Sequence, residues 1–543
     1  MRFSHIAAGL GWAVTTTSAA SNCGRDVYDY IVVGGGPSGI ITAERLSAAN
    51  HKVLLLERGH GPTVATGSNY TLPWNDTLTP IDVPALSSAV NTLPLWNEYF
   101  CSDTPASACV LGGGTTINYM VFVHPPAHDF ENWPKGWNWE DIAPAAQRLY
   151  DRNPGSTLPS EDGQRYDQGL YSLLSNLFGN LGWKSIDMID QPDEKHEVYS
   201  YPAWNIKDAL RAGPVRTYLP LALERDNFTL RTGAKVIRLI REGSRVTGVE
   251  YESSGRRQIV KLAAKGRVVL SSGSLSTPRI LFHSGIGPAA QIQTAKDSGV
   301  EVPPEEDWIN LPVGQNLKDH PIFPIIVKSN QTWGPLNTAS VLNSSDEKNI
   351  GLYESQGSGV LTQGRHRLIY FTSREGQDGT TRYFQGSCAA SGKGVFTVTS
   401  YLTHGLTSTG VLGLDKDGKT VIEQSPYLQT EADIEASTSF VQNMIDIFTA
   451  PGTGLAMNTT TNATAILKSR TNGNHFVGTT KLGTDDGRMG GTSVVDLNAK
   501  VYGTDNLFVT DAGIHPDLPT GNTQAIVMVV AEAAVAKILA YKD

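Results

Sequence analysis

The fold is decided by the sequence DYIVVGGGPSG at residues 29–39 and by KVLLLE at residues 52–57. The apolar, β-branched run Tyr30–Val33 is typical of a strand buried on both faces. Residues 40–49 after the glycines predict a helix, and a second apolar strand then ends in Glu57. This order of strand, glycine turn, helix, strand and acid predicts a Rossmann-like unit that binds a dinucleotide.

Each residue of this motif has a mechanical role. Gly34 permits the tight turn, Gly36 lets the backbone approach a pyrophosphate, and Gly39 packs the helix against the strand. The helix N-terminus attracts phosphates, and Glu57 accepts hydrogen bonds from ribose. An acid at this position disfavours a 2′-phosphate, so the motif predicts FAD or NAD over NADP. The alternative is a turn that needs glycine for its backbone alone.

The composition is that of a folded, acidic protein. Of 543 residues, 40% are hydrophobic and 18% are charged, which excludes a largely disordered chain. The net charge of −9 argues against nucleic acid or an anionic membrane as a partner. No internal apolar stretch is long enough for a membrane span, and no cysteine spacing resembles a metal site. We therefore predict neither a metal nor a membrane or nucleic-acid partner.

The N-terminus predicts secretion. Residues 1–20 have one positive charge, a modest apolar stretch and small residues at the end, as in a signal peptide; the alternative is a disordered extension. Cys101 and Cys109 close a short loop in which a disulfide is plausible, whereas Cys23 and Cys388 could pair or stay free. Seven glycosylation sequons agree with an extracellular glycoprotein and start at Asn69, Asn75, Asn227, Asn330, Asn343, Asn458 and Asn462.

Further motifs extend along the chain. They are LGGGTTIN at 111–118, GSLSTPRILFHSGIG at 273–287, NLPVGQNLKDH at 310–320, DAG at 511–513 and PTGN at 519–522. With the first motif, and in this order, they make the chain resemble the glucose–methanol–choline (GMC) oxidoreductases, whose members bind FAD. The resemblance covers nearly the whole chain beyond residue 29.

The resemblance implies an α/β + β fold: a Rossmann-like FAD-binding domain with an interleaved substrate domain built on an antiparallel sheet. Residues 29–70, 227–288 and 502–541 are interpreted as the discontinuous FAD-binding domain. Residues 71–226 are interpreted as mixed FAD-covering and substrate segments, and residues 321–483 as the substrate-binding domain.

The same resemblance implies a set of cofactor-binding residues. The glycine loop at 112–118 could bring backbone N–H groups and Asn118 to a polar ring system, although alone it also fits a flexible turn. A helix predicted over Gln524–Leu539 would aim its N-terminus at the flavin pyrimidine and stabilise negative charge there. The predicted cofactor-binding residues are Gly34, Gly36, Pro37, Ser38, Gly39, Glu57, Gly114, Thr115, Asn118, Val236, Asp511, Ala512 and Thr523.

Oxidation of an alcohol by hydride transfer needs a base on the hydroxyl, a task that suits histidine near neutral pH. By motif position, His475 resembles the family's base and Asn522 its partner on the substrate oxygen, while Asn474 is predicted to contact the substrate. His515 is the competing candidate for the base.

The pairing of histidine with asparagine, and several other stretches, resemble the cellobiose-dehydrogenase-like members of the family. The resemblance implies oxidation of a sugar's anomeric hydroxyl to a lactone, with a quinone, a metalloprotein or O₂ as electron acceptor. Thr409 stands where those members place a sugar-binding arginine, and Thr523 where many relatives carry proline. A non-sugar alcohol, a lyase or cyclase without redox turnover, and a non-catalytic flavin protein remain alternatives. Four aromatic residues fit either sugar stacking or core packing: Tyr201, Trp204, Tyr383 and Phe384.

Overall fold

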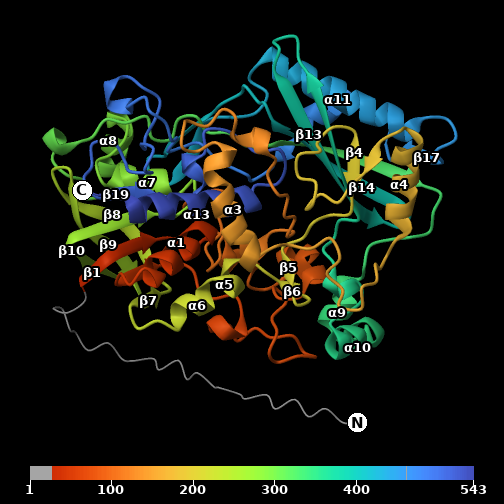
Figure 1. Cartoon of the computed structure of the whole chain (residues 1–543), viewed down its shortest axis with the longest axis horizontal. Coiled ribbons are helices and arrows are strands. Elements are labelled where there is room, and N and C mark those ends of the chain that lie inside the picture. The colour runs from red at the N-terminus through yellow and green to blue at the C-terminus, as the bar shows by residue number, and fades with distance from the viewer. Residues whose placement is uncertain (1–26, 460, 543) are drawn as a thin grey trace.

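The computed structural model describes residues 27–459 and 461–542. It contains two large sheets, each in its own half of the molecule, and Figure 1 shows the two halves side by side. The first half contains the Rossmann-like unit and the second an almost wholly antiparallel sheet, so the predicted fold class is confirmed.

The first sheet is assembled from segments far apart in the sequence. Its strand order is β7-β2-β1-β10-β9-β8, with β19 added beside β10; the pairs among β7, β2, β1, β10 and β19 are parallel, and those made by β8 and β9 are antiparallel. Its strands are β1 (Val27–Val33), β2 (Val53–Leu56), β7 (Phe228–Arg231), β8 (Lys235–Glu242), β9 (Arg245–Ser253), β10 (Arg256–Leu270) and β19 (Leu507–Val509).

Two helices from opposite ends of the chain pack against one another beside this sheet (Figure 1). They are α1 (Pro37–Ala48), which follows β1, and α13 (Gln524–Ala540) near the C-terminus. Every residue of α13 from Gln524 to Val535 is buried, as expected for a helix that is apolar on all sides. The predicted helices at 40–49 and 524–539 are thus confirmed within a few residues.

The second sheet has the order β17-β11-β14-β13-β12-β4-β3, with β18 beside β11. All of its pairs are antiparallel except β3 with β4, which the sequence analysis did not predict. The strands are β3 (Lys184–Ser185), β4 (Val198–Ser200), β11 (Pro321–Ser329), β12 (Leu368–Glu375), β13 (Thr381–Gly392), β14 (Val395–His404), β17 (Leu455–Met457) and β18 (Thr471–Asn472).

The two faces of the second sheet have different chemistry. Phe384, Val398 and their same-face neighbours pack in an apolar core beneath α4 (Gly169–Asn180) and α11 (Glu431–Thr449), which crosses the sheet in Figure 1. Because side chains alternate along a strand, the neighbouring residues point to the opposite face. There the register pairs Gln385 with Tyr401 and Ser387 with Thr399, and we call these four residues the site face.

Shorter elements connect the two halves. The remaining α-helices are α2 (Gly114–Ile117), α3 (Trp139–Arg152), α5 (Pro214–Thr217), α6 (Leu219–Leu223), α7 (Thr277–His283), α8 (Ala289–Asp297), α9 (Thr338–Leu342), α10 (Glu347–Gln356) and α12 (Ala463–Lys468). The remaining strands form two small hairpins: β5 (Ile206–Lys207) with β6 (Leu210–Arg211), and β15 (Val411–Leu414) with β16 (Thr420–Gln424).

The predicted disulfide between Cys101 and Cys109 is present, with the two Cα atoms 5.2 Å apart. Cys388 is a buried thiol on β13, and Cys23 lies outside the described residues, as does the predicted signal peptide at 1–20. None of the helices in residues 27–459 and 461–542 combines the length and apolarity needed to cross a bilayer.

Candidate active site

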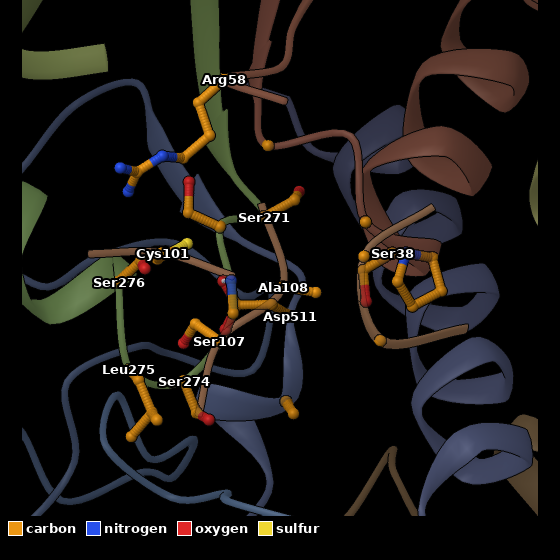
Figure 2. A pocket seen from close by; sticks show the side chains of 18 of the residues that line it. Ser38, Arg58, Cys101, Ser107, Ala108, Ser271, Ser274, Leu275, Ser276 and Asp511 are labelled. Atoms are coloured by element: carbon orange, nitrogen blue, oxygen red, sulfur yellow. Dashed lines mark hydrogen bonds between the residues drawn. The ribbon is translucent and has the colours of Figure 1, made fainter. Parts of the chain in front are cut away.

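One cleft collects most of the predicted cofactor residues and both of the predicted residues Asn474 and His475. It opens where parallel strands end, since Gly34 follows β1, Glu57 follows β2 and Ser271 follows β10. This edge of a doubly wound sheet is where such folds bind their ligands. In Figure 2, Ser38 approaches the cleft from one side and Ser271, Ser274 and Ser276 from the other.

Two glycines of the first motif are required by the protein itself. Gly34 has a φ of +102°, and a Cβ there would lie 2.6 Å from the carbonyl oxygen of Ser271. A Cβ on Gly39 would lie 1.8 Å from the carbonyl oxygen of Gly34. The structure therefore places Gly34 in the tight turn and Gly39 in the helix–strand contact, as predicted; Gly39 does not itself line the cleft.

Three other glycines border open space in the cleft. A Cβ on Gly36 would meet nothing closer than an oxygen of Ser271 at 3.9 Å, and a Cβ on Gly114 or Gly273 would meet nothing within 4 Å. All three residues line the cleft. Gly273 also has a φ of +86°, which favours glycine by itself, whereas at Gly36 and Gly114 neither packing nor backbone conformation excludes a side chain, so their bareness fits close approach by a bound cofactor.

Replacing Gly36 by valine is therefore expected to exclude the cofactor without unfolding the chain. The φ of Gly36 is −72°, which suits valine, and the new side chain points into open space. We expect the bound-flavin absorbance per protein to fall about tenfold or more while circular dichroism is unchanged. Gly351→Val is the matched control, because a Cβ there also meets nothing within 4 Å and lies in exposed α10. Full flavin content in Gly36→Val would contradict the assignment.

Glu57 is held rigidly at the edge of the cleft. Its two carboxylate oxygens accept hydrogen bonds from the backbone N–H groups of Gly35 and Gly59, each at 2.6 Å. Burial raises the pKa of this carboxyl group. The carboxylate keeps lone pairs for further donors and lines the cleft together with the predicted Val236, which fits the recognition of ribose hydroxyls.

The disulfide loop forms a further wall that the sequence analysis did not assign. Cys101 and residues 106–108 line the cleft (Figure 2). Asp103 in this loop pairs with Arg58 at 2.9 Å, Lys235 at 2.6 Å and Arg279 at 2.7 Å. Burial opposes ionisation, but Arg279 and Arg58 hold the pKa of Asp103 well below its ordinary value. The loop is thus tied to three separate segments of the first half.

The other end of the cleft is formed by C-terminal residues. Asp511 accepts hydrogen bonds from the backbone N–H of Gly273 at 3.0 Å and from the Thr277 hydroxyl at 2.6 Å, so it joins two of the motifs. Ala512 and Thr523 also line the cleft. No side chain caps the N-terminus of α13, and the buried Nε2 of Gln524 has no partner in the described chain. Unpaired N–H donors at a helix N-terminus stabilise negative charge, so they suit the polar edge of a ring that accepts electrons.

Thr115 and Asn118 lie outside the residues that line this cleft. The Thr115 hydroxyl donates to the carbonyl oxygen of Gly112 at 2.7 Å, and the Asn118 amide donates to Gln524 Oε1 at 2.9 Å. In this structure both side chains hold the glycine loop in place through these hydrogen bonds. The predicted Pro37, Ser38 and Gly114 do line the cleft.

The structure brings the predicted base and its partner together. Asn522 Nδ2 lies 3.4 Å from His475 Nε2, although the two residues are 47 positions apart. Gln385 on the site face donates from Nε2 to Asn522 Oδ1 at 2.8 Å, which turns the amide group of Asn522 toward the imidazole. Since an amide nitrogen only donates, this arrangement makes His475 Nε2 an acceptor.

His320 completes the assignment of protons. Its Nδ1 lies 2.9 Å from His475 Nδ1, so one ring must donate to the other. With Nε2 of His475 an acceptor, the proton sits on His475 Nδ1 and is donated to His320. Burial and the neighbouring His475 hold the pKa of His320 well below its ordinary value, which keeps it neutral. His475 therefore presents a lone pair on Nε2, as a general base requires.

Asp319 holds the backbone that carries the base. Its carboxylate accepts hydrogen bonds from the backbone N–H groups of His475 at 2.6 Å, Asn474 at 3.1 Å and His320 at 2.8 Å, and from the Tyr427 hydroxyl. Asn474 itself has a left-handed φ of +57°, a conformation that asparagine tolerates better than most residues. The Asp319 carboxylate is fully buried, and burial raises its pKa to about 6.

The pKa values of His475 and Asp319 predict that the rate of flavin reduction falls in two steps as the pH is lowered. Burial lowers the pKa of His475 to about 4, so the base loses its lone pair only below that pH. Protonation of Asp319 below about pH 6 removes an acceptor from the loop. The rate of flavin reduction, measured by pH-jump stopped flow, should be constant above pH 7 and decline around pH 6. Below pH 4 it should fall about tenfold for each pH unit. In the variant Asp319→Asn, only the decline near pH 6 should disappear from the pH profile. A decline near pH 6 that persists in this variant would contradict its assignment to Asp319.

The alternative base lies elsewhere. His515 is fully buried, packs edge-on against Trp133 with ring centroids 5.3 Å apart, and does not line the cleft.

Of the four aromatic candidates, Phe384 stacks on Phe440 in the core, Trp204 is buried, Tyr383 stacks on His128, and Tyr201 stacks on Tyr171. Sugar stacking by Phe384 and Trp204 is therefore not supported.

A buried clamp that the sequence analysis missed fixes the loop of Asn522. The Asp129 carboxylate accepts from the backbone N–H of Thr520 at 2.9 Å and from its hydroxyl at 2.6 Å. His128 Nε2 lies 2.8 Å from the same hydroxyl, and His404 Nδ1 contacts the carbonyl oxygen of Leu518. Only the spatial meeting of these segments reveals the clamp, because Asp129 and Thr520 are 391 positions apart.

Comparison with known families agrees with this geometry. The family model described as GMC oxidoreductase matches residues 28–322 in its N-terminal part and 407–531 in its C-terminal part. A Rossmann-like half with a histidine–asparagine pair beside its cleft fits an oxidoreductase that uses a dinucleotide cofactor. The chain belongs to the GMC oxidoreductase family, whose cofactor is FAD.

The relatives are distant but cover the chain along nearly its whole length. An oxygen-dependent choline dehydrogenase of Vibrio vulnificus is 28% identical over 94% of this chain and 94% of its own. The chloroplastic fatty acid photodecarboxylase of Chlamydomonas reinhardtii is 27% identical over 96% and 92%. Among solved structures, the formate oxidase of Aspergillus oryzae RIB40 superposes with a TM-score of 0.75 at 20% identity, covering 95% of this chain and 98% of that one.

Proposed function

We propose that the protein oxidises the anomeric hydroxyl of a mono- or oligosaccharide to a lactone. The observation that carries the proposal is the meeting of His475 Nε2 and Asn522 Nδ2 beside the FAD cleft. A base and an amide donor at one point can act on the same hydroxyl group, which is what oxidation of an alcohol to a carbonyl requires.

In this proposal the chain's residues prepare the alcohol for loss of hydride. His475 Nε2 accepts the hydroxyl proton, and Asn522 Nδ2 donates to the oxygen as negative charge develops on it. His320 accepts from His475 Nδ1, which supports the positive charge that the ring gains. The bare glycines, Glu57 and the N-terminus of α13 would hold FAD, which supplies the hydride acceptor.

The site face supports a polyhydroxylated substrate. It consists of Gln385, Ser387, Thr399 and Tyr401, all of which carry hydrogen-bonding groups, whereas the opposite face of the same strands is apolar. The Oε1 atom of Gln385 is buried and has no hydrogen-bond partner in the described chain. The resemblance to cellobiose-dehydrogenase-like enzymes points to the same substrate class.

Secretion is part of the proposal and rests on the predicted signal at 1–20. The Cys101–Cys109 disulfide supports it, because such bonds persist in oxidising compartments. Among the sequons, Asn69, Asn330, Asn343 and Asn462 are exposed. Asn227 is a poor acceptor of a glycan, since its amide nitrogen donates to the carbonyl oxygens of Ser47 at 2.9 Å and His51 at 2.8 Å.

Anaerobic mixing of the purified holoenzyme with a panel of reducing sugars tests the function. The expected result is bleaching of the yellow flavin, followed by colour recovery on adding a quinone or O₂, with the lactone as product. Non-sugar alcohols are the comparison arm, and bleaching by these alone would refute the sugar assignment. Turnover of any compound without bleaching would refute the oxidation itself and support a lyase or cyclase.

A further inference from the structure

A buried arginine holds the end of the glycine loop at residues 112–118. Arg211, on β6, donates from Nε to the carbonyl oxygen of Ile81 at 2.9 Å. Its Nη1 donates to the carbonyl oxygens of Thr115 at 3.1 Å and Asn118 at 2.9 Å. The same Nη1 also donates to Oδ1 of the Asn118 side chain at 3.1 Å. Arg211 therefore fixes both the backbone of the loop and the amide group of Asn118.

The hydrogen-bond partners of Asn118 decide which way its amide group is turned. A guanidinium nitrogen and a backbone N–H can only donate. Asn118 meets one of each at the same atom, from Arg211 and from the backbone N–H of Met120 at 3.0 Å, so that atom must be its oxygen. Its amide nitrogen then faces Gln524 Oε1 at 2.9 Å. Two independent donors thus determine the direction of the contact with Gln524.

Gln524 takes its own orientation from this contact. Because Nδ2 of Asn118 can only donate, Gln524 must offer its oxygen there and turn its Nε2 away. Gln524 is 7% exposed, and its Nε2 is buried without a hydrogen-bond partner in the part of the chain that the structure describes. Buried polar groups nearly always have a partner, so an unused donor that is held in one direction points to a ligand that accepts from it.

Gln524 stands at the end of the cleft where the base lies. It is the first residue of α13 and comes directly after Asn522 and Thr523. Asn522 Nδ2 is 3.4 Å from His475 Nε2, and Thr523 lines the cleft. The ring that accepts hydride must contact the substrate and therefore lies beside the same base. The polar edge of this ring is thus the part of the cofactor nearest to Gln524.

The loop that carries Asn118 borders the cleft as well, because Gly113 and Gly114 line it. The hydrogen bond between Asn118 and Gln524 therefore joins two segments that both border the cofactor cleft. We infer that Gln524 Nε2 donates a hydrogen bond to the electron-accepting ring of FAD, and that Arg211 and Asn118 are positioning residues that hold this donor in its direction.

The consequence is a higher reduction potential of the bound flavin. The ring gains negative charge when it accepts electrons, so a fixed donor at its polar edge stabilises the reduced form more than the oxidised form. The free N–H groups at the start of α13 act in the same sense, and the side chain of Gln524 adds to them. This role does not depend on which alcohol the enzyme oxidises, since it concerns the cofactor alone.

The donor is tested by the midpoint potential of the flavin, measured by equilibrating the holoenzyme with redox dyes in the absence of substrate. Gln524→Met removes the amide and keeps an unbranched side chain. We expect the affinity for reduced relative to oxidised flavin to fall about ten- to a hundredfold, which lowers the two-electron potential by about 30–60 mV. Flavin content and circular dichroism should stay the same. An unchanged potential would overturn the inference.

The matched control is Gln363→Met. Gln363 is also buried, its Oε1 accepts from the backbone N–H of Tyr166 at 3.2 Å, and it does not line the cleft. Its replacement should leave the potential unchanged, and a shift equal to that in Gln524→Met would show a general effect on the fold and overturn the inference. Gln524→Leu is prepared in parallel and should give the same fall, so that a folding defect of one variant does not decide the result.

Asn118→Asp tests the positioning role. A carboxylate still accepts from Arg211 and Met120 but cannot donate to Gln524, whose amide then turns, donates to the carboxylate and presents its oxygen to the ring. The potential should fall at least as far as in Gln524→Met, although Gln524 is intact. In the double variant it should equal that of Gln524→Met alone. Additive falls would show that the new charge acts on the ring directly and would overturn the positioning role.

Discussion

His475→Ala is expected to slow flavin reduction by about 10²–10⁴-fold while the protein keeps its FAD. The imidazole lines the cleft, presents a lone pair on Nε2 toward Asn522, and is held neutral by burial, which lowers its pKa to about 4. Alanine removes the Nε2 atom that takes the hydroxyl proton in this proposal. Single-turnover stopped flow under anaerobic conditions measures the loss directly.

The loss should lie in kcat more than in KM, since Asn522 and the site face remain to bind the substrate. His196→Ala is the matched control: this histidine is exposed and contacts Ser373 on the sheet, far from the cleft residues. A His475→Ala enzyme that reduces its flavin within tenfold of the unmodified rate would remove this residue from the role of base.

Asp319→Asn is expected to cost both activity and stability. The carboxylate accepts from three backbone N–H groups and one hydroxyl, whereas a carboxamide has only one accepting oxygen. At least one buried donor then loses its partner, at a cost of about 1–3 kcal/mol for each such group. We expect a fall in kcat/KM of about 10²-fold, because His475 and Asn474 lose their common anchor, and a lower Tm by calorimetry.

The control for this variant is Asp417→Asn, an exposed carboxylate that pairs only with Lys416. It should change neither Tm nor kcat/KM appreciably. If Asp319→Asn lowered Tm but left kcat/KM intact, the carboxylate would be a stabilising group of the loop and not a positioning residue for the base.

Much of the fold was predictable from local sequence. The run Tyr30–Val33, the glycine turn and the segment ending in Glu57 all lie within residues 29–57, and strand periodicity and turn chemistry act over such short distances. The helix at 524–539 follows from an apolar run without proline or glycine. The pair of His475 and Asn522 was predicted from motif position, and the structure brings the imidazole and the carboxamide together.

The groups that hold this pair could not be found in the same way. Asp319 and His320 stand inside a recognised motif, but nothing local shows that their side chains reach residues 474 and 475. Gln385 faces Asn522 only because the register of β13 against β14 puts it on one face of the sheet. Such register is set by packing between distant segments, and a shift of one residue would have turned Gln385 into the core.

The parallel sheet that carries the cofactor cleft has a consequence for biosynthesis. β19 pairs with β10, and α13 packs against α1. The packing of α1, near the start of the chain, therefore requires residues from the last tenth of the chain. Before residues 507–540 are synthesised, the cleft lacks Asp511, Thr523 and the helix end beside them. A chain truncated before residue 507 is therefore expected to bind no FAD.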